Sequence, residues 1–143
     1  MNKISRTLAL VGTVAALASC SAMSDMMGMG QQVTLSGANE VPPVSTSASG
    51  SGTVTIKDDH TVSADITVTG MVATAAHIHQ GAKGANGKVV VPFTKVGDNH
   101  FAAPAGAKLS DEAYAAYKAG DLYVNVHSAA HPGGEVRAQL TAP

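Results

Sequence analysis

Apolar and polar residues alternate one by one through the middle of the chain. Valine and isoleucine alternate with threonine in residues 53–56, and Val62, Ala64, Ile66 and Val68 alternate with polar residues further on. Successive side chains of a β-strand point to opposite faces, so this period of two predicts strands with one face in a core. The pattern therefore favours a β-protein.

Other short runs of strand-forming residues are separated by Gly, Pro, Asn and Asp. The further candidate strands are 33–35, 74–79, 88–93, 100–102, 122–127 and 135–140. Short strands separated by turns predict an all-β fold, namely an antiparallel Greek-key β-sandwich or barrel of about seven to eight strands. One short helix is expected at 111–119, because Ser110 is a favourable N-cap and Gly120 follows the last turn.

The first residues are similar to an export signal. Lys3 and Arg6 precede an apolar stretch at 8–18, which is too short to span a membrane. The sequence Leu-Ala-Ser-Cys at 17–20 resembles a bacterial lipoprotein signal, which implies that residues 1–19 are removed and that Cys20 is acylated. The alternative is an ordinary secretory signal with a chance cysteine.

We therefore expect a lipid-anchored protein of the cell envelope. Because Ser21 follows Cys20 instead of aspartate, a Gram-negative host would place it in the outer membrane, facing the periplasm or the cell surface. Residues 20–32 predict a flexible tether with four methionines, whose thioethers are also suited to Cu(I). The folded domain is then expected at 33–143.

The composition of the expected mature chain excludes several classes of function. It holds seven basic and ten acidic side chains, so nothing in its charge favours nucleic acid. Cys20 is the only cysteine of the sequence, so no disulfide within the chain is expected. The glycines of 81–87 lack a following helix for a phosphate loop, and Ser128 beside His127 does not make a catalytic triad.

Histidines are concentrated in two of the candidate strands. His77 and His79 would lie on one face of a strand, roughly 6.5 Å apart. His127 lies in the second segment, and His131 follows four residues later as a further candidate ligand. Three neutral imidazoles with an open position suit Zn(II) or Cu(II), so copper or zinc binding is the predicted chemistry.

The same alternation assigns a common face to these residues, provided that their strands are neighbours. This outward face, opposite the core, would form a surface histidine cluster. It would carry His77, His79, Tyr123, Asn125, His127, Glu135, Arg137 and Gln139. A metal-bound histidine usually donates its other N–H to a carboxylate or carbonyl, which makes Glu40 and Glu135 candidate second partners. An ion pair between Glu135 and Arg137 with a purely structural role is an equal alternative. His60 and His100 are expected to be solvated turn residues.

Four ordered motifs, at 35–44, 76–81, 122–128 and 132–140, resemble the CHRD domain, a module named from chordin and common in bacterial secreted proteins. The resemblance covers about 33–140. The positions that recur in the family match Glu40, His77, His79, His127, Glu135 and Arg137, whereas His131 lies where the family is expected to vary. In chordin such domains belong to an extracellular protein that binds growth factors, while the bacterial versions mostly have no assigned activity.

Three functions remain open from the sequence. The first is an envelope protein that binds copper or zinc for metal sequestration or tolerance. The second is an enzyme similar to copper superoxide dismutases, in which Arg137 would attract the anionic substrate. The third is a module that binds a protein or glycan without metal. We expect the first, with no catalytic residue.

Overall fold

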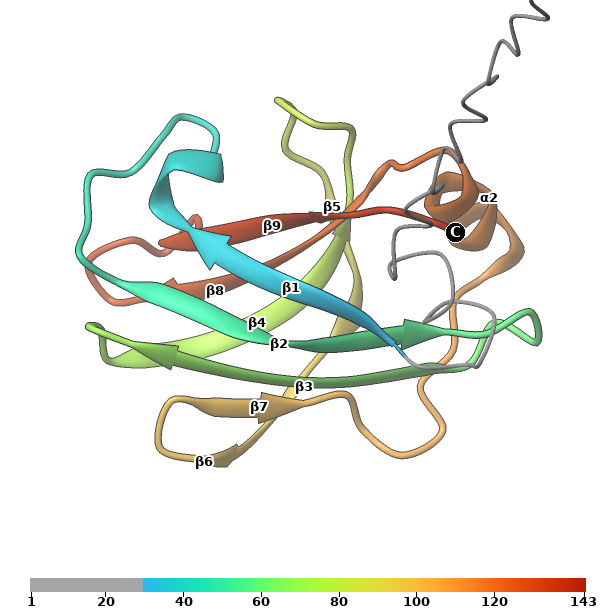
Figure 1. The fold of residues 1–143 in the computed structure, drawn as a ribbon, viewed down its shortest axis with the longest axis horizontal. Coiled ribbons are helices and arrows are strands. Elements are labelled where there is room, and N and C mark those ends of the chain that lie inside the picture. The colour runs from blue at the N-terminus through green and yellow to red at the C-terminus, as the bar shows by residue number, and fades with distance from the viewer. Residues whose placement is uncertain (1–29) are drawn as a thin grey trace, which may run out of the picture.

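A computed structural model describes residues 30–143 of the chain (Figure 1). The expected signal segment, Cys20 and most of the expected tether lie outside these residues. The last two tether residues, Gln31 and Gln32, belong to the first strand, so the folded domain begins two residues before Val33. Both residues pair with the second strand, which explains why they are ordered despite a sequence without apolar alternation.

The described residues form nine strands. They are β1 (Gln31–Ser36), β2 (Ser49–Ile56), β3 (Val62–Thr69), β4 (Ala73–Gln80), β5 (Lys88–Pro92), β6 (Thr94–Gly97), β7 (His100–Ala102), β8 (Leu122–Ser128) and β9 (Val136–Leu140). The expected all-β class is confirmed. The strand that the sequence did not reveal is β6, whose residues are all exposed and therefore carry no core-facing pattern.

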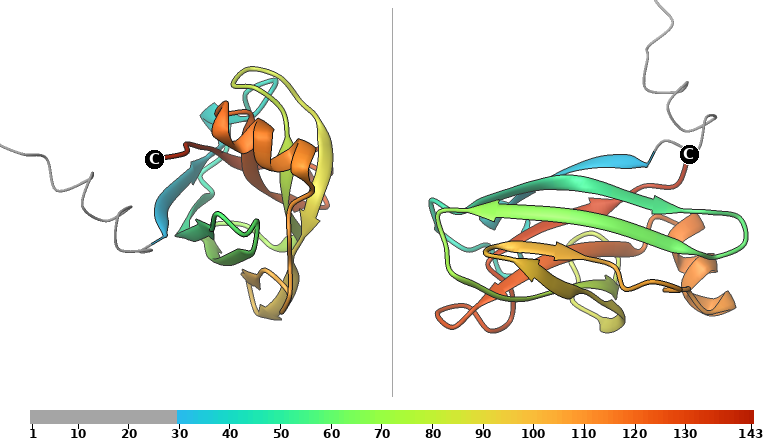
Figure 2. Two further views of the ribbon diagram at one scale, coloured as in Figure 1. Left: turned by 90° about the vertical axis from the view of Figure 1, so that its right-hand side faces the viewer. Right: turned by 90° about the horizontal axis from the view of Figure 1, so that it is seen from below.

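The strands form one antiparallel sheet in the order β5-β4-β8-β9-β1-β2-β3-β7-β6. Seen along its length, this sheet curls round into a nearly closed barrel (Figure 2). The two ends of the sheet approach each other. Nζ of Lys95 in β6, one end strand, donates to the carbonyl oxygen of Ala73 in β4, the neighbour of the other end strand β5 (3.2 Å). Of the two expected architectures, a sandwich and a barrel, the structure has the barrel-like one.

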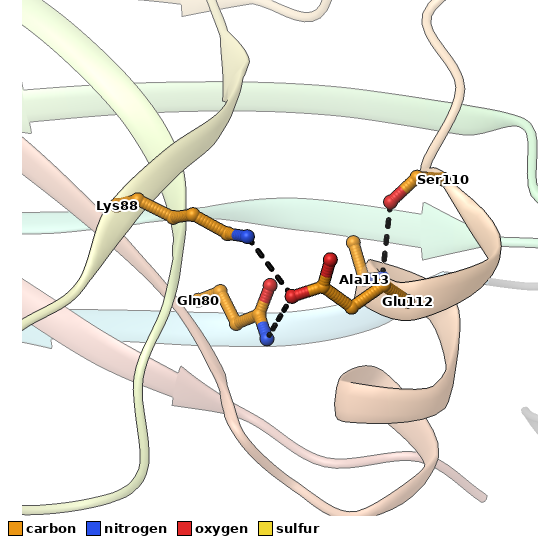
Figure 3. Close-up of polar contacts among 5 residues, drawn as sticks. All are labelled: Gln80, Lys88, Ser110, Glu112 and Ala113. Atoms are coloured by element: carbon orange, nitrogen blue, oxygen red, sulfur yellow. Dashed lines mark hydrogen bonds and ion pairs between the residues drawn. The ribbon is translucent and has the colours of Figure 1, made fainter.

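The helix α2 (Asp111–Lys118) is the one α-helix among the described residues. Its N-cap is Ser110, as predicted, since the Ser110 hydroxyl accepts a hydrogen bond from the Ala113 N–H at 3.1 Å (Figure 3). The Glu112 carboxylate accepts from Lys88 at 2.9 Å and from Gln80 at 3.4 Å, which fastens the helix to β4 and β5. Within residues 30–143, no helix combines the length and the apolar character that crossing a membrane requires.

The barrel interior is filled mainly by aliphatic side chains. Its fully buried members include Leu35, Ile66, Ile78, Leu122, Val124, Val126, Val136 and Leu140. One strand differs from the others: every residue of β8 is buried, on both faces. Its inner face packs in the core, so its outer, polar face must be covered by other parts of the chain. That covered face carries the candidate site.

Candidate metal centre

The three central strands of the candidate site are neighbours. β8 lies between β4 and β9, with His77 opposite Asn125 and His79 opposite Tyr123 in the β4–β8 register. Asn125 in turn lies opposite Arg137 of β9. The alternation along each strand therefore places the histidines, Tyr123, Asn125 and Arg137 on one face of the sheet, as the sequence predicted on condition that these strands pair.

This face is not a solvent-exposed surface, which corrects the expected surface histidine cluster. His79 and His127 are 8% exposed and Arg137 is 1% exposed, while His77 is half-buried. The loops after β1, β4 and β8 cover the face, and their carbonyl groups supply hydrogen-bond partners to its side chains. These loop carbonyl groups satisfy part of the buried polar face, including Nδ1 of His79 and Nδ1 of His127.

His77, His79 and His127 come together as a compact group. Each offers one ring nitrogen, and these three nitrogens all lie within 4.8 Å of one another. Nδ1 of His77 lies 2.9 Å from Nε2 of His127, and the ring centroids of His77 and His79 are 5.4 Å apart. Among the histidine, cysteine and acidic side chains of residues 30–143, these three histidines are the group with the spacing of a metal site.

Backbone carbonyl groups orient two of the rings. Nδ1 of His79 donates to the carbonyl oxygen of Gly87 (3.0 Å), and Nδ1 of His127 donates to that of Pro132 (2.9 Å). A neutral imidazole carries one N–H, so Nε2 of both rings must present a lone pair. Nε2 of His127 accepts from His77, whereas Nε2 of His79 is buried without a hydrogen-bond partner.

The surroundings keep the histidines neutral. Burial, together with the neighbouring His127 and His79, lowers the pKa of His77 to about 4. Burial also lowers the pKa of His79 and of His127, against the opposing hydrogen bonds to Gly87 and Pro132. Because all three pKa values are depressed, the imidazoles are in the form that binds metal ions at neutral pH.

These shifts predict how the stability of the metal-free protein depends on pH. A histidine with a folded pKa below its usual 6.5 contributes stability above pH 6.5 that is lost as the pH falls towards the folded value, about 4 for His77. We expect the thermal midpoint to fall between pH 6.5 and 5, before most carboxylates titrate. A midpoint that rises on this acidification would contradict the expected neutral histidines.

Glu40 changes the pH dependence of stability in the direction opposite to the histidines. Burial raises its pKa to about 7, although Arg137 and Asn125 lower it, so its contribution is present below its ordinary value and is lost as the pH rises through 7. Glu40→Gln should therefore make the rise of stability between pH 5 and 7 steeper than in the wild type. Thermal unfolding followed by circular dichroism in both proteins measures this difference.

A stack of side chains supports His79 from behind. The rings of His79 and Tyr123 are nearly parallel (5°) with centroids 4.9 Å apart, and the Arg137 guanidinium carbon lies 3.4 Å from the Tyr123 ring centroid. Because Tyr123 belongs to the strand between the other two, its ring lies between them. Gly87 links the stack, since its N–H donates to the Tyr123 hydroxyl (3.1 Å) and its carbonyl accepts from His79.

Arg137 has a structural role in this arrangement. Its guanidinium donates to Asn86 Oδ1 (3.3 Å), to the Ala82 carbonyl oxygen (3.2 Å) and to Gln139 Oε1 (3.1 Å). Burial lowers its pKa, although Tyr123 and Glu40 raise it. The guanidinium is 1% exposed and is held by the loop after β4, so it does not present its donors to an anion in solvent.

Neither glutamate supplies the hydrogen bond that was expected for the histidines. Glu135 accepts from the hydroxyls of Thr46 (2.7 Å) and Ser128, and these bonds outweigh burial to lower its pKa. Glu40 is 4% exposed and lies beside Asn125 and Gly134. The histidine partners are the loop carbonyls of Gly87 and Pro132, since loops and not neighbouring strands cover the rings.

The remaining histidines lie outside the group. The backbone of His131 forms the turn after β8, hydrogen-bonded to Ser128. His60 stacks on Tyr114 with ring centroids 4.1 Å apart, and His100 lies 2.9 Å from the Asp65 carboxylate. His60 and His100, expected to be only solvated, thus each have a side-chain partner.

The comparisons with known proteins agree with the sequence motifs. The family model described as CHRD domain matches residues 31–140, which includes every strand of the described fold. Neither the curated proteins nor the solved structures contain a match to the chain. With more than half of its length matched by that model, the chain belongs to the CHRD domain family.

Proposed function

We propose that this protein binds one transition-metal ion, copper or zinc, through His77, His79 and His127. The observation that carries the proposal is Nε2 of His79, a buried lone pair that has no hydrogen-bond partner and belongs to a group of three imidazoles. A buried acceptor without a partner is unfavourable, and a metal ion bound by the group would satisfy it. We propose that this binding serves metal sequestration or tolerance in the cell envelope.

The geometry and chemistry of the group fit such an ion. Imidazole nitrogens bind zinc at about 2.0–2.1 Å, so two ligand nitrogens of one ion lie roughly 3–4 Å apart. The three nitrogens already lie within 4.8 Å of one another, so small ring rotations suffice. Carbonyl groups that hold the opposite ring nitrogen are the usual outer partners of metal-bound histidines. Neutral imidazoles suit both copper and zinc, and the Irving–Williams order favours Cu(II) when both are present.

Metal content of the purified protein tests the proposal. The protein is incubated separately with Cu²⁺ and Zn²⁺, freed of excess ion and measured by elemental analysis. We expect one ion per chain in the wild type and in a control with His60, His100 and His131 replaced by alanine. The variant with His77, His79 and His127 replaced by alanine should retain only trace metal. Equal metal in the two triple variants would contradict the proposed site.

The interaction-module alternative makes a different prediction in the same samples. A protein or glycan surface without metal would leave the folded wild type unable to take up either ion. A partner found by affinity capture would then remain bound after chelation and after histidine substitution. Loss of that partner on addition of a chelator would instead support the metal site.

We propose further that the chain is anchored to a membrane of the cell envelope by acylation of Cys20. The support is the sequence at 17–20 after a short apolar stretch. In a bacterial host, the wild type should carry incorporated radioactive palmitate and partition into detergent, whereas Cys20→Ala should do neither. Detergent partition of the Cys20→Ala variant equal to that of the wild type would contradict the anchor.

A further inference from the structure

Asn125 has a buried polar atom beside the histidines that no protein group satisfies. Its side chain is 2% exposed, and its Oδ1 has no hydrogen-bond partner. Nε2 of His79, a residue that is 8% exposed, is likewise buried without a hydrogen-bond partner. Buried acceptors are normally paired, so two of them next to each other indicate a ligand that supplies a donor or a positive charge.

The register places Asn125 at the centre of the histidine group. It lies directly opposite His77 on β4 and two residues before His127 on the same face of β8. Cross-strand neighbours have Cβ atoms roughly 4.5–5.5 Å apart. The Asn125 side chain also raises the pKa of His79, against the lowering by burial.

The orientation of the Asn125 amide follows from its other neighbours. Nδ2 faces the carbonyl oxygen of Gly133 at 3.5 Å. A Cβ built on Gly134 would lie 2.5 Å from both Asn125 Nδ2 and Glu40 Oε1, so the amide nitrogen and this carboxylate oxygen share one small space. The Gly133 carbonyl can only accept a hydrogen bond, which places the NH₂ group on its side. The acceptor atom Oδ1 therefore belongs to the other side of the amide.

We propose that Asn125 is a specificity-determining residue, whose Oδ1 accepts a hydrogen bond from a water molecule that completes the coordination of the ion at His77, His79 and His127. The inference rests on the proposed function. Three imidazoles leave a fourth position on a tetrahedral Zn²⁺, and Cu²⁺ also retains oxygen ligands. Cu⁺ is a softer ion that does not need a water ligand. The site should therefore favour hydrated divalent ions over Cu⁺.

Glu40 lies on the NH₂ side of Asn125. Its Oε1 is buried near Nδ2 of Asn125 and has no hydrogen-bond partner of its own. Glu40 also lines a groove of about 590 Å³ between residues 41–45 and the turn at 130–134. Gly134 permits the contact, since a side chain there would collide with Glu40 and Asn125.

Affinity measurements on the purified protein test the role of Asn125. Zn²⁺ is titrated against a chromogenic chelator, and Cu⁺ is titrated anaerobically against a Cu⁺-specific chelator. Asn125→Leu, close to asparagine in size, should lower the Zn²⁺ affinity about 10–100-fold, as the loss of an outer partner does. Its Cu⁺ affinity should stay within about threefold of the wild type.

An equal loss of Zn²⁺ and Cu⁺ affinity in Asn125→Leu, or no loss of either, would overturn the inference while leaving metal binding intact. A wild type that binds neither ion would overturn the proposed function itself. If Asn125→Leu does not fold, pulsed electron paramagnetic resonance of the Cu²⁺-loaded wild type in D₂O decides. Strong coupling to exchangeable deuterons is expected, and its absence would overturn the inference.

Discussion

His79→Ala should lower the affinity for Zn²⁺ and Cu²⁺ by more than about 100-fold, because loss of an outer partner alone costs 10–100-fold and this change removes a ligand. The substitution removes the one ring nitrogen of the group that is buried without any hydrogen-bond partner. Competition titrations against a chelator of known affinity measure the effect. The largest loss is expected here because His79 is fixed both by Gly87 and by the Tyr123 ring.

Two alanine variants are matched controls for this prediction. His131→Ala removes the candidate ligand outside the three-histidine group, and His100→Ala removes an imidazole that contacts Asp65. Both should change the affinity by less than about threefold. If His131→Ala weakens binding as much as His79→Ala, the ion is bound nearer the turn after β8 than we infer.

Gly87→Ala should destabilise the fold and weaken metal binding together. A Cβ at this position would overlap the carbonyl oxygen of Gln80, which is backbone and cannot rotate away. Forcing an extra methyl group into a packed site costs about 1–3 kcal/mol, and occasionally more. The displaced residue also carries the carbonyl that orients His79 and the N–H that holds Tyr123. Metal affinity should therefore fall about tenfold or more.

Gly133→Ala is the corresponding control, because a Cβ there meets no atom within 4 Å. It should unfold within about 0.5 kcal/mol of the wild type, as surface substitutions usually do. Chemical denaturation and chelator competition on the same preparations separate the two effects. A Gly87→Ala protein with wild-type metal affinity would show that the loop after β4 does not support His79.

The strands and the grouping of histidines could be predicted from local patterns. Alternation in 74–79 and 122–127 indicated which side chains share a face, because the facing of side chains depends only on the two-residue period of a strand. The Ser110 cap was also local, since it depends on residues within one helical turn. Strand β6 was missed because no residue of it faces the core.

What covers the histidine face could not be predicted from such patterns. The loops at 81–87 and 129–135 have no periodicity, and their carbonyl groups act through backbone atoms that are the same for every residue type. Glutamates therefore looked like the natural partners, whereas Gly87 and Pro132 fill that role. Gly87 is the one local sign of this loop, because a glycine is needed where the backbone packs this closely against Gln80, and such a glycine indicates a fixed loop. Asn125 was grouped correctly on the face, yet its orientation depends on the carbonyl group of Gly133 in the loop at 129–135.

The most direct test of the central claim is an anomalous diffraction map from crystals of the protein grown with one equivalent of Zn²⁺ or Cu²⁺. The account predicts a single anomalous peak between the rings of His77, His79 and His127, at about 2.0–2.1 Å from one nitrogen of each. A peak elsewhere, for example at His60, His100 or His131, or the absence of any peak in crystals of the folded protein, would contradict it.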